Sequence, residues 1–218
     1  MPVREIGKSY SSLTGVIQSA KTGNQVKFES SLERDMAYLL EFDPTVLSYE
    51  IQPLKIEYMG ADGSKRKYTP DFLVYYNPER ELSKKLKPRL CEVKYRDDLK
   101  SKWKELKPKF KAAQAYAKRC GWEFKIYTEK EIRNDFLYNA KFLSGYLRAD
   151  YNESHSSALK QAMKKIETST PEELISICSN DKFERAQLLH ALWSLVAQGF
   201  VKIDLQEKIQ MDSVIWIN

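Results

Sequence analysis

The sequence has few histidine and cysteine residues and no long apolar segment. Among 218 residues there are two histidines and three cysteines, and Cys91, Cys120 and Cys178 lack the spacing of a zinc site. We therefore expect reduced, buried thiols and neither a zinc centre nor histidine-based catalysis. No stretch approaches the roughly 20 apolar residues of a membrane-spanning helix, and the first residues lack the apolar segment of a secretory signal. The composition predicts a globular protein of the cytoplasm.

Charge divides the chain into two parts. The net charge is +6 overall. Residues 1–149 contain 29 Lys and Arg against 20 Asp and Glu, whereas residues 150–218 contain 7 against 10. A polar segment at 148–157 is interpreted as a linker. We expect an N-terminal domain (1–149) that meets a polyanion and a C-terminal domain (150–218) that meets protein; the alternative is that the asymmetry is incidental.

Hydrophobic periodicity and capping signals predict an α/β fold for the first domain. The expected elements are, in order, a hairpin, a helix, three extended segments, a helix, a strand and a helix, over residues 12–28, 30–42, 46–58, 68–76, 90–95, 101–120, 122–127 and from 128 onward. This order predicts a mixed sheet flanked by helices, the arrangement of a restriction-endonuclease-like core.

The second domain is expected to be small and mainly helical. Three helices are predicted at 157–167, from 170 onward and at 183–198, and a hairpin at 200–204 and 214–217 follows. Three helices and a β-wing make a winged-helix domain. The third helix contains Arg185 as its only arginine or lysine, which favours a partner protein over DNA.

Two short motifs on neighbouring strands suit metal-dependent phosphodiester hydrolysis. Asp71 follows Pro70 at the start of one strand, and Glu92 and Lys94 lie two apart on the next, so both point to one face. If the strands pair antiparallel, Asp71 and Glu92 can converge on one ion. Two carboxylates can hold Mg²⁺, which stabilises phosphate charge and acidifies bound water, while the lysine orients the attacking water. This is the PD-(D/E)xK pattern of a nuclease.

A third acid, Glu33, borders the apolar face of the first helix. It forms a capping box with Ser30 or points into the cleft as a metal ligand, and one carboxylate serves both roles only in part. For Glu92 and Lys94 the alternative is a solvated strand face. The expected catalytic residues are Glu33, Asp71, Glu92 and Lys94, and the expected metal ligands are Glu33, Asp71, Glu92 and the backbone carbonyl of Val93.

Basic residues flank the Glu92 strand and suit phosphate contacts, which give salt-sensitive, sequence-independent affinity for DNA. The expected contacts are Gln52, Lys84, Lys85, Lys87, Arg89, Arg96, Lys100, Lys102 and Lys104, and the run continues with Lys107, Lys109 and Lys111. Each has an ordinary alternative. The lysine run is a solvated helix face, Trp103 packs its helix rather than a base, and Gln52 belongs to an edge strand.

The ordered set Phe28–Asp35, Tyr68–Phe72 and Cys91–Lys94 resembles the TnsA family, the endonuclease subunits of heteromeric bacterial transposons of the Tn-seven type. The resemblance covers nearly the whole chain. It matches Glu33 to the family's helix acid, Asp71 to its central metal-binding aspartate and Lys94 to its catalytic lysine. Glu92 occupies a position that some members fill with glutamine.

By this resemblance the protein is expected to be a bacterial Mg²⁺-dependent endonuclease, with Mn²⁺ able to substitute, that cuts the 5′ ends of a transposon during cut-and-paste transposition. The implied partners are transposon-end DNA, a DDE transposase (TnsB-like) that processes the 3′ ends, and an AAA+ ATPase (TnsC-like) bound by the C-terminal domain. The alternatives are a restriction or repair endonuclease with the same core, and a catalytically silent DNA-binding adaptor.

Overall fold

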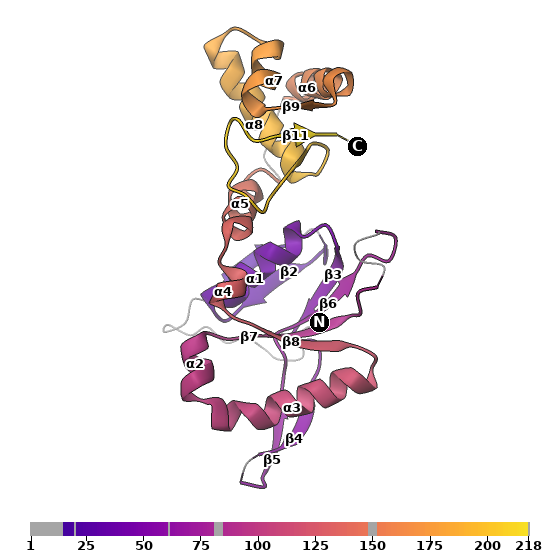
Figure 1. The fold of residues 1–218 in the computed structure, drawn as a ribbon, viewed down its shortest axis with the longest axis vertical. Coiled ribbons are helices and arrows are strands. Elements are labelled where there is room, and N and C mark those ends of the chain that lie inside the picture. The colour runs from indigo at the N-terminus through magenta and orange to yellow at the C-terminus, as the bar shows by residue number, and fades with distance from the viewer. Residues whose placement is uncertain (1–14, 20, 61, 81–84, 148–151, 218) are drawn as a thin grey trace. The chain divides into compact units, whose positions relative to one another are not determined.

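The computed structural model describes residues 15–19, 21–60, 62–80, 85–147 and 152–217 of the chain (Figure 1). The chain forms two compact units, one ending at Arg133 and one beginning at Asn134. The predicted boundary at 149/150 lies later in the sequence than this division. Of the predicted linker, residues 148–151 lie outside the described residues, and Glu153 already begins a helix.

A four-stranded mixed sheet forms the centre of the first unit. Its strand order is β3 (Val46–Ile51), β6 (Phe72–Tyr76), β7 (Arg89–Val93) and β8 (Glu123–Tyr127). The pairs β3–β6 and β6–β7 are antiparallel, and β7–β8 is parallel. The two motif strands pair antiparallel, which is the condition under which Asp71 and Glu92 were expected to converge.

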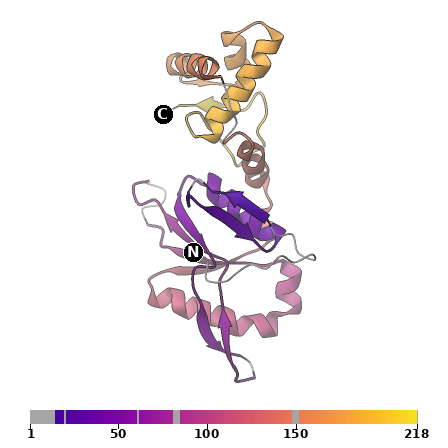
Figure 2. The same cartoon turned by 180° about the vertical axis from the view of Figure 1, so that it is seen from behind.

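Helices lie on both sides of this sheet (Figures 1 and 2). Helix α1 (Ser31–Phe42) lies on one side, and α3 (Trp103–Arg119) lies on the other. The apolar face of α3 carries Ala113 and Ala117, which pack against Leu73 and Leu90 of the central strands. The chain between β8 and the second unit forms the short helix α4 (Glu129–Ile132), closed by a capping box at Thr128.

Two antiparallel hairpins complete the first unit. The first joins β1 (Gly15–Gln18) to β2 (Gln25–Phe28); the start of the predicted hairpin, 12–14, lies outside the described residues. The second joins β4 (Ile56–Met59) to β5 (Lys65–Tyr68) and projects past α3 in Figure 1. Ile56 and Tyr68 anchor it because both are buried against the alanines of α3.

Two local predictions need correction. Residues after Lys94 form an additional helix, α2 (Arg96–Ser101), whose first turn holds Asp97 and Asp98, acids that stabilise a helix N-terminus. The cysteines are free, but only Cys91 is buried. Cys120 is exposed because it follows the last turn of α3, beyond the helix's apolar face.

The second unit contains four helices and a small sheet among its described residues. The helices are α5 (Asp135–Ser144), α6 (Glu153–Ile166), α7 (Pro171–Cys178) and α8 (Lys182–Ala197). The strands β9 (Thr168–Ser169), β10 (Lys202–Ile203) and β11 (Ile215–Trp216) pair antiparallel in the order β10-β11-β9. The predicted hairpin therefore pairs with a third strand, β9, which lies between the first two predicted helices in the sequence.

Helix α5 belongs to the second unit because its side chains pack there. Asn139 is fully buried; its amide donates to the carbonyls of Leu205 and Glu207 and its oxygen accepts from the Ile209 N–H. Phe142 packs edge-on against Trp193 at a centroid distance of 5.4 Å. No helix in the described part of the chain is long and apolar enough to cross a membrane.

Candidate active site

The antiparallel pairing of β6 and β7 brings Asp71 beside Glu92. Asp71 immediately precedes β6, and its N–H donates to the Cys91 carbonyl at 3.1 Å. Its side-chain Oδ2 accepts the Val93 N–H at 2.7 Å. Glu92 and Lys94 come from the adjoining stretch of β7 and the residues just after it. Three of the four predicted catalytic side chains thus lie at one end of two adjacent strands.

Glu92 is the most enclosed carboxylate of this group, with 1% of its side chain exposed. Its Oε2 accepts from the Tyr68 hydroxyl. Its Oε1 accepts from Lys109 Nζ at 3.0 Å and lies 3.4 Å from Lys94 Nζ. Because a buried carboxylate needs charge partners, two lysines and a tyrosine account for its burial.

Lys109 belongs to the candidate site, although the sequence grouped it with the basic run that was expected to contact DNA. Neither that expectation nor its alternative, a solvated helix face, describes its surroundings: the Lys109 side chain is only 17% exposed, and its ammonium lies 4.7 Å from the centre of the Tyr68 ring. The spacing of Lys109 from the apolar residues of α3 could have predicted that it lies on the buried side of the helix. Lys109 follows the buried Leu106 by three and precedes the buried Ala113 by four, so it lies on the buried side of α3.

Burial and neighbouring charges together shift the pKa values of Asp71 and Lys94. Burial raises the pKa of Asp71 well above its usual value, the neighbouring Glu92 raises it further, and Lys94 opposes the rise. Burial would lower the pKa of Lys94, but Asp71, Glu92 and Glu33 outweigh it and raise that pKa to about 12. Lys94 is therefore a cation at neutral pH, surrounded by carboxyl groups.

Glu33 takes part in the N-cap of α1, but the capping box expected for it is incomplete, because its carboxylate accepts from the Glu29 N–H rather than from the Ser30 N–H. Its Oε1 accepts from the Ser30 hydroxyl and its Oε2 from the Glu29 N–H, each at 2.9 Å, and the Ser30 Oγ in turn accepts the Glu33 N–H. Burial raises its pKa, and the bonds from Glu29 and Ser30 lower it. The Glu33 carboxylate lies within electrostatic reach of Lys94, but both of its oxygens already have partners.

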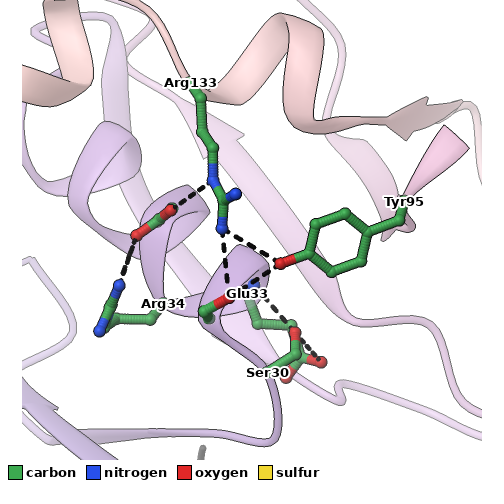
Figure 3. A network of polar contacts seen from close by, with 7 residues as sticks. Ser30, Glu33, Arg34, Tyr95 and Arg133 are labelled. Carbon is green, nitrogen blue, oxygen red and sulfur yellow. Dashed lines mark hydrogen bonds and ion pairs between the residues drawn. The ribbon is translucent and has the colours of Figure 1, made fainter.

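A polar network joins the start of α1 to the end of β7 (Figure 3). The Arg133 guanidinium donates to the buried Asp35 at 3.0 Å, to the Ser31 hydroxyl at 3.2 Å and to the Tyr95 hydroxyl at 3.1 Å. Ser31 and Tyr95 share a further hydrogen bond of 2.8 Å, and Arg34 pairs with the other oxygen of Asp35. The network fixes Tyr95, the neighbour of Lys94, against the helix that carries Glu33.

Gln52 has an unusual conformation beside the site. Its φ of 47° is in the left-handed region, and its N–H donates to the Asp71 carbonyl at 2.9 Å. Its side-chain nitrogen lies 3.4 Å from a Glu29 carboxylate oxygen, while its buried Oε1 has no hydrogen-bond partner among the described residues. Strained residues and unpaired buried polar atoms cluster at functional sites. With 6% of its surface exposed, Gln52 does not occupy the surface position expected of a DNA contact.

The donor set of the site fits a hydrated Mg²⁺ ion. Mg²⁺ is usually held by one or two carboxylates, with water and substrate phosphate completing its shell. Asp71 and Glu92 are two such carboxylates, and an ion between them would share the Glu92 oxygens with Tyr68, Lys94 and Lys109. Among the described residues no three Asp, Glu, His or Cys side chains form a metal-binding group.

The remaining predicted DNA contacts differ in exposure. Arg89 is half-buried, and its guanidinium donates hydrogen bonds to the Glu123 carboxylate and to the Tyr127 hydroxyl on the neighbouring strand β8. Lys100 and Lys102 are exposed but pair with Asp97 and Asp98. Trp103 is 45% exposed and packs against Phe110 of its own helix. Lys84 lies outside the described residues, and the other predicted contacts are exposed, namely Lys85, Lys87, Arg96 and Lys104.

Two family models match the chain. One, described as TnsA-like endonuclease N terminal, matches residues 43–129, and the other, described as TnsA endonuclease C terminal, matches residues 131–205. Asp71, Glu92, Lys94 and Lys109 lie within the first match, and Glu33 lies before it. No curated protein shows significant sequence similarity to the chain.

Proposed function

Because the chain belongs to the TnsA endonuclease family, we propose that it is a metal-dependent DNA endonuclease that cuts the 5′ ends of a transposon during cut-and-paste transposition. One observation carries the proposal. Asp71, Glu92 and Lys94, the acids and lysine of a PD-(D/E)xK site, lie together at the end of adjacent antiparallel strands. This supports a restriction-endonuclease-like core in the first unit.

The site residues divide the chemistry between them. Asp71, Glu92 and the Val93 carbonyl would hold Mg²⁺, which when bound supplies charge stabilisation for the phosphate and acidifies water. Lys94, a cation in this site, orients the attacking water and stabilises negative charge that develops on the phosphate. Glu33 contributes negative charge beside Lys94 and fixes the start of α1 by accepting hydrogen bonds from the Ser30 hydroxyl and the Glu29 N–H. Tyr68 and Lys109 hold the Glu92 carboxylate.

The DNA-binding surface extends over α3 and the β4–β5 hairpin. The exposed lysines Lys104, Lys107 and Lys111 of α3 provide phosphate contacts. Lys65 and Lys67 alternate with Arg66 on β5, so they share one face of the hairpin, and all three are exposed. A two-stranded ribbon fits a DNA major groove, and β5 leads directly through Tyr68 to Asp71. The hairpin was not among the DNA contacts predicted from the sequence.

The second unit is proposed to be a winged-helix domain that binds the AAA+ regulator, while a DDE transposase processes the 3′ ends. The order helix, strand, helix, helix, strand, strand from α6 to β11 supports the winged helix. Residues from 150 onward carry an excess of acidic groups, which disfavours phosphate contacts. Exposed apolar side chains on this unit, Ile177 at 63%, Phe183 at 82% and Phe200 at 56%, suit a protein partner.

A reconstituted excision assay tests the function. Transposon-end DNA is incubated with Mg²⁺, the transposase, the ATPase and either the wild-type chain or Asp71→Asn, and the 5′ and 3′ strand cuts are measured separately. We expect Asp71→Asn to lose the 5′ cuts by at least about a hundredfold, since it removes a metal ligand, and to keep the 3′ cuts.

The matched control is Asp97→Asn, which makes the same change at a carboxylate that is 98% exposed on α2. It should cut both strands as the wild type does. If Asp71→Asn also makes 5′ cuts at the wild-type rate, the site is structural, and the chain is a DNA-binding adaptor.

A further inference from the structure

We propose that Lys109 is a positioning residue of the reaction: it binds the Glu92 carboxylate so that Lys94 stays available to the phosphate, and it weakens metal binding in doing so. The proposal rests on the nuclease function proposed above and adds a residue that the PD-(D/E)xK pattern does not contain. It comes from α3, on the opposite side of the sheet from α1.

The geometry makes Lys109 the closer cation of Glu92. Its Nζ lies 3.0 Å from Glu92 Oε1, against 3.4 Å for Lys94 Nζ. The Tyr68 ring beneath the Lys109 ammonium, 4.7 Å away, favours a cation at that point. Lys109 is also the less exposed of the two lysines, at 17% against 29%. The Lys109 side chain is thus more enclosed by the protein, whereas the Lys94 side chain is more exposed to solvent.

The consequence for Lys94 follows from competition for one oxygen. Both ammonium groups approach Glu92 Oε1, while Oε2 is occupied by the Tyr68 hydroxyl. Without Lys109, the buried Glu92 charge keeps Lys94 as its only nearby lysine partner among those the structure describes. We expect Lys94 then to close onto Glu92 and to leave the position from which it would act on water and phosphate. Small displacements of a catalytic group cost large factors in rate.

Loss of Lys109 should strengthen metal binding, although it slows cleavage. Lys109 places a positive charge directly on an oxygen of a proposed metal ligand. Removing that charge strengthens the attraction of the site for a divalent cation. A variant without the Lys109 charge should therefore bind metal more tightly and cut more slowly. A lysine that only supported the fold would, when lost, weaken metal binding and cleavage together.

The experiment measures both quantities for Lys109→Gln. Metal binding is measured by titrating the purified full chain with Mn²⁺ alone. The electron paramagnetic resonance signal of free Mn²⁺ gives the fraction of the metal that is bound. Cleavage of the 5′ strand is measured at saturating Mg²⁺ in the reconstituted reaction. We expect Mn²⁺ to bind at least about threefold more tightly and 5′ cleavage to be at least about tenfold slower.

Two comparisons keep the outcome interpretable. Lys118→Gln changes an exposed lysine near the other end of the same helix and should leave Mn²⁺ binding and the cleavage rate as in the wild type. Lys109→Arg keeps the charge and should restore wild-type Mn²⁺ affinity. If Lys109→Gln lacks a cooperative thermal transition, Lys109→Met, which keeps an apolar stem against the Tyr68 ring, is judged by the same criteria.

The proposal is overturned if the variant without the charge binds Mn²⁺ as weakly as the wild type or more weakly, or if it cuts at the wild-type rate. Failure of the underlying nuclease function is recognised separately, because Asp71→Asn would then cut the 5′ strand as the wild type does.

Discussion

Lys21 shows how one buried charge links stability to pH. Its ammonium donates to the backbone carbonyls of Leu40 and Asp43 at the C-terminal end of α1, where helix carbonyls lack partners within the helix. Burial lowers its pKa from 10.5 to about 8, although Asp43 and Glu41 oppose the shift. The folded state therefore releases this proton at a lower pH than the unfolded chain does.

A lysine whose pKa is lowered by folding makes stability rise with pH between its two pKa values, because the unfolded chain binds more protons there. Between pH 7.5 and 9.5 the Lys21 contribution to the free energy of unfolding should increase by about 1–2 kcal/mol. Urea denaturation of the wild type and of Lys21→Met at both pH values measures this, since subtraction cancels the ionisation of tyrosines. If the free energy of unfolding depends on pH equally in the two proteins, Lys21 does not have a lowered pKa in the folded state.

At the scale of single residues, side-chain alternation was sufficient to predict which three side chains of the candidate site lie together. Asp71, Glu92 and Lys94 follow from period-two geometry and from the antiparallel pairing of two strands. The Ser30–Glu33 spacing predicted the N-cap at Ser30, but the Glu33 carboxylate accepts from the Glu29 N–H and does not complete the predicted capping box. Gln52 could not be predicted in the same way, because its left-handed backbone and unpaired oxygen arise from the chain's path between β3 and β4 rather than from a pattern in the sequence.

Among the elements, α3 and the β4–β5 hairpin are where the sequence was least informative. Helical periodicity predicts α3, but composition alone treats its lysines as equivalent, and only packing against Tyr68 and Glu92 separates Lys109 from the exposed ones. The basic outer face of the hairpin was not predicted, because the register that places Lys65 and Lys67 on one face is fixed by the burial of Ile56 opposite Tyr68.

The hairpin should contribute to DNA affinity through phosphate charge. Lys65→Gln combined with Lys67→Gln should weaken binding of the full chain to duplex DNA and reduce the slope of log K against log salt by about 1–2, since each phosphate contact releases counterions. Filter binding or fluorescence anisotropy between low and moderate salt measures the slope.

The matched control for the hairpin variant is Lys164→Gln combined with Lys165→Gln, which removes two exposed lysines from α6. It should leave the salt slope unchanged. Identical slopes for the wild type and the hairpin variant would remove the hairpin from the DNA-binding surface.

For the whole molecule, the sequence predicted two parts of opposite charge, but it did not locate the division between them. Polarity suggested a linker at 148–157, whereas the compact units divide between Arg133 and Asn134. The reason is tertiary. Helix α5 is amphipathic and fits either neighbour by pattern alone, and only the hydrogen bonds of Asn139 and the packing of Phe142 on Trp193 assign it to the second unit.

Anomalous diffraction from crystals of the full chain grown with Mn²⁺ would show whether Asp71 and Glu92 hold a metal ion, as we propose. We expect an anomalous peak within about 2.5 Å of a carboxylate oxygen of each of these residues and of the Val93 carbonyl oxygen, and no peak there in Asp71→Asn. A fully occupied Mn²⁺ elsewhere with this position empty, or an unchanged peak in Asp71→Asn, would contradict it.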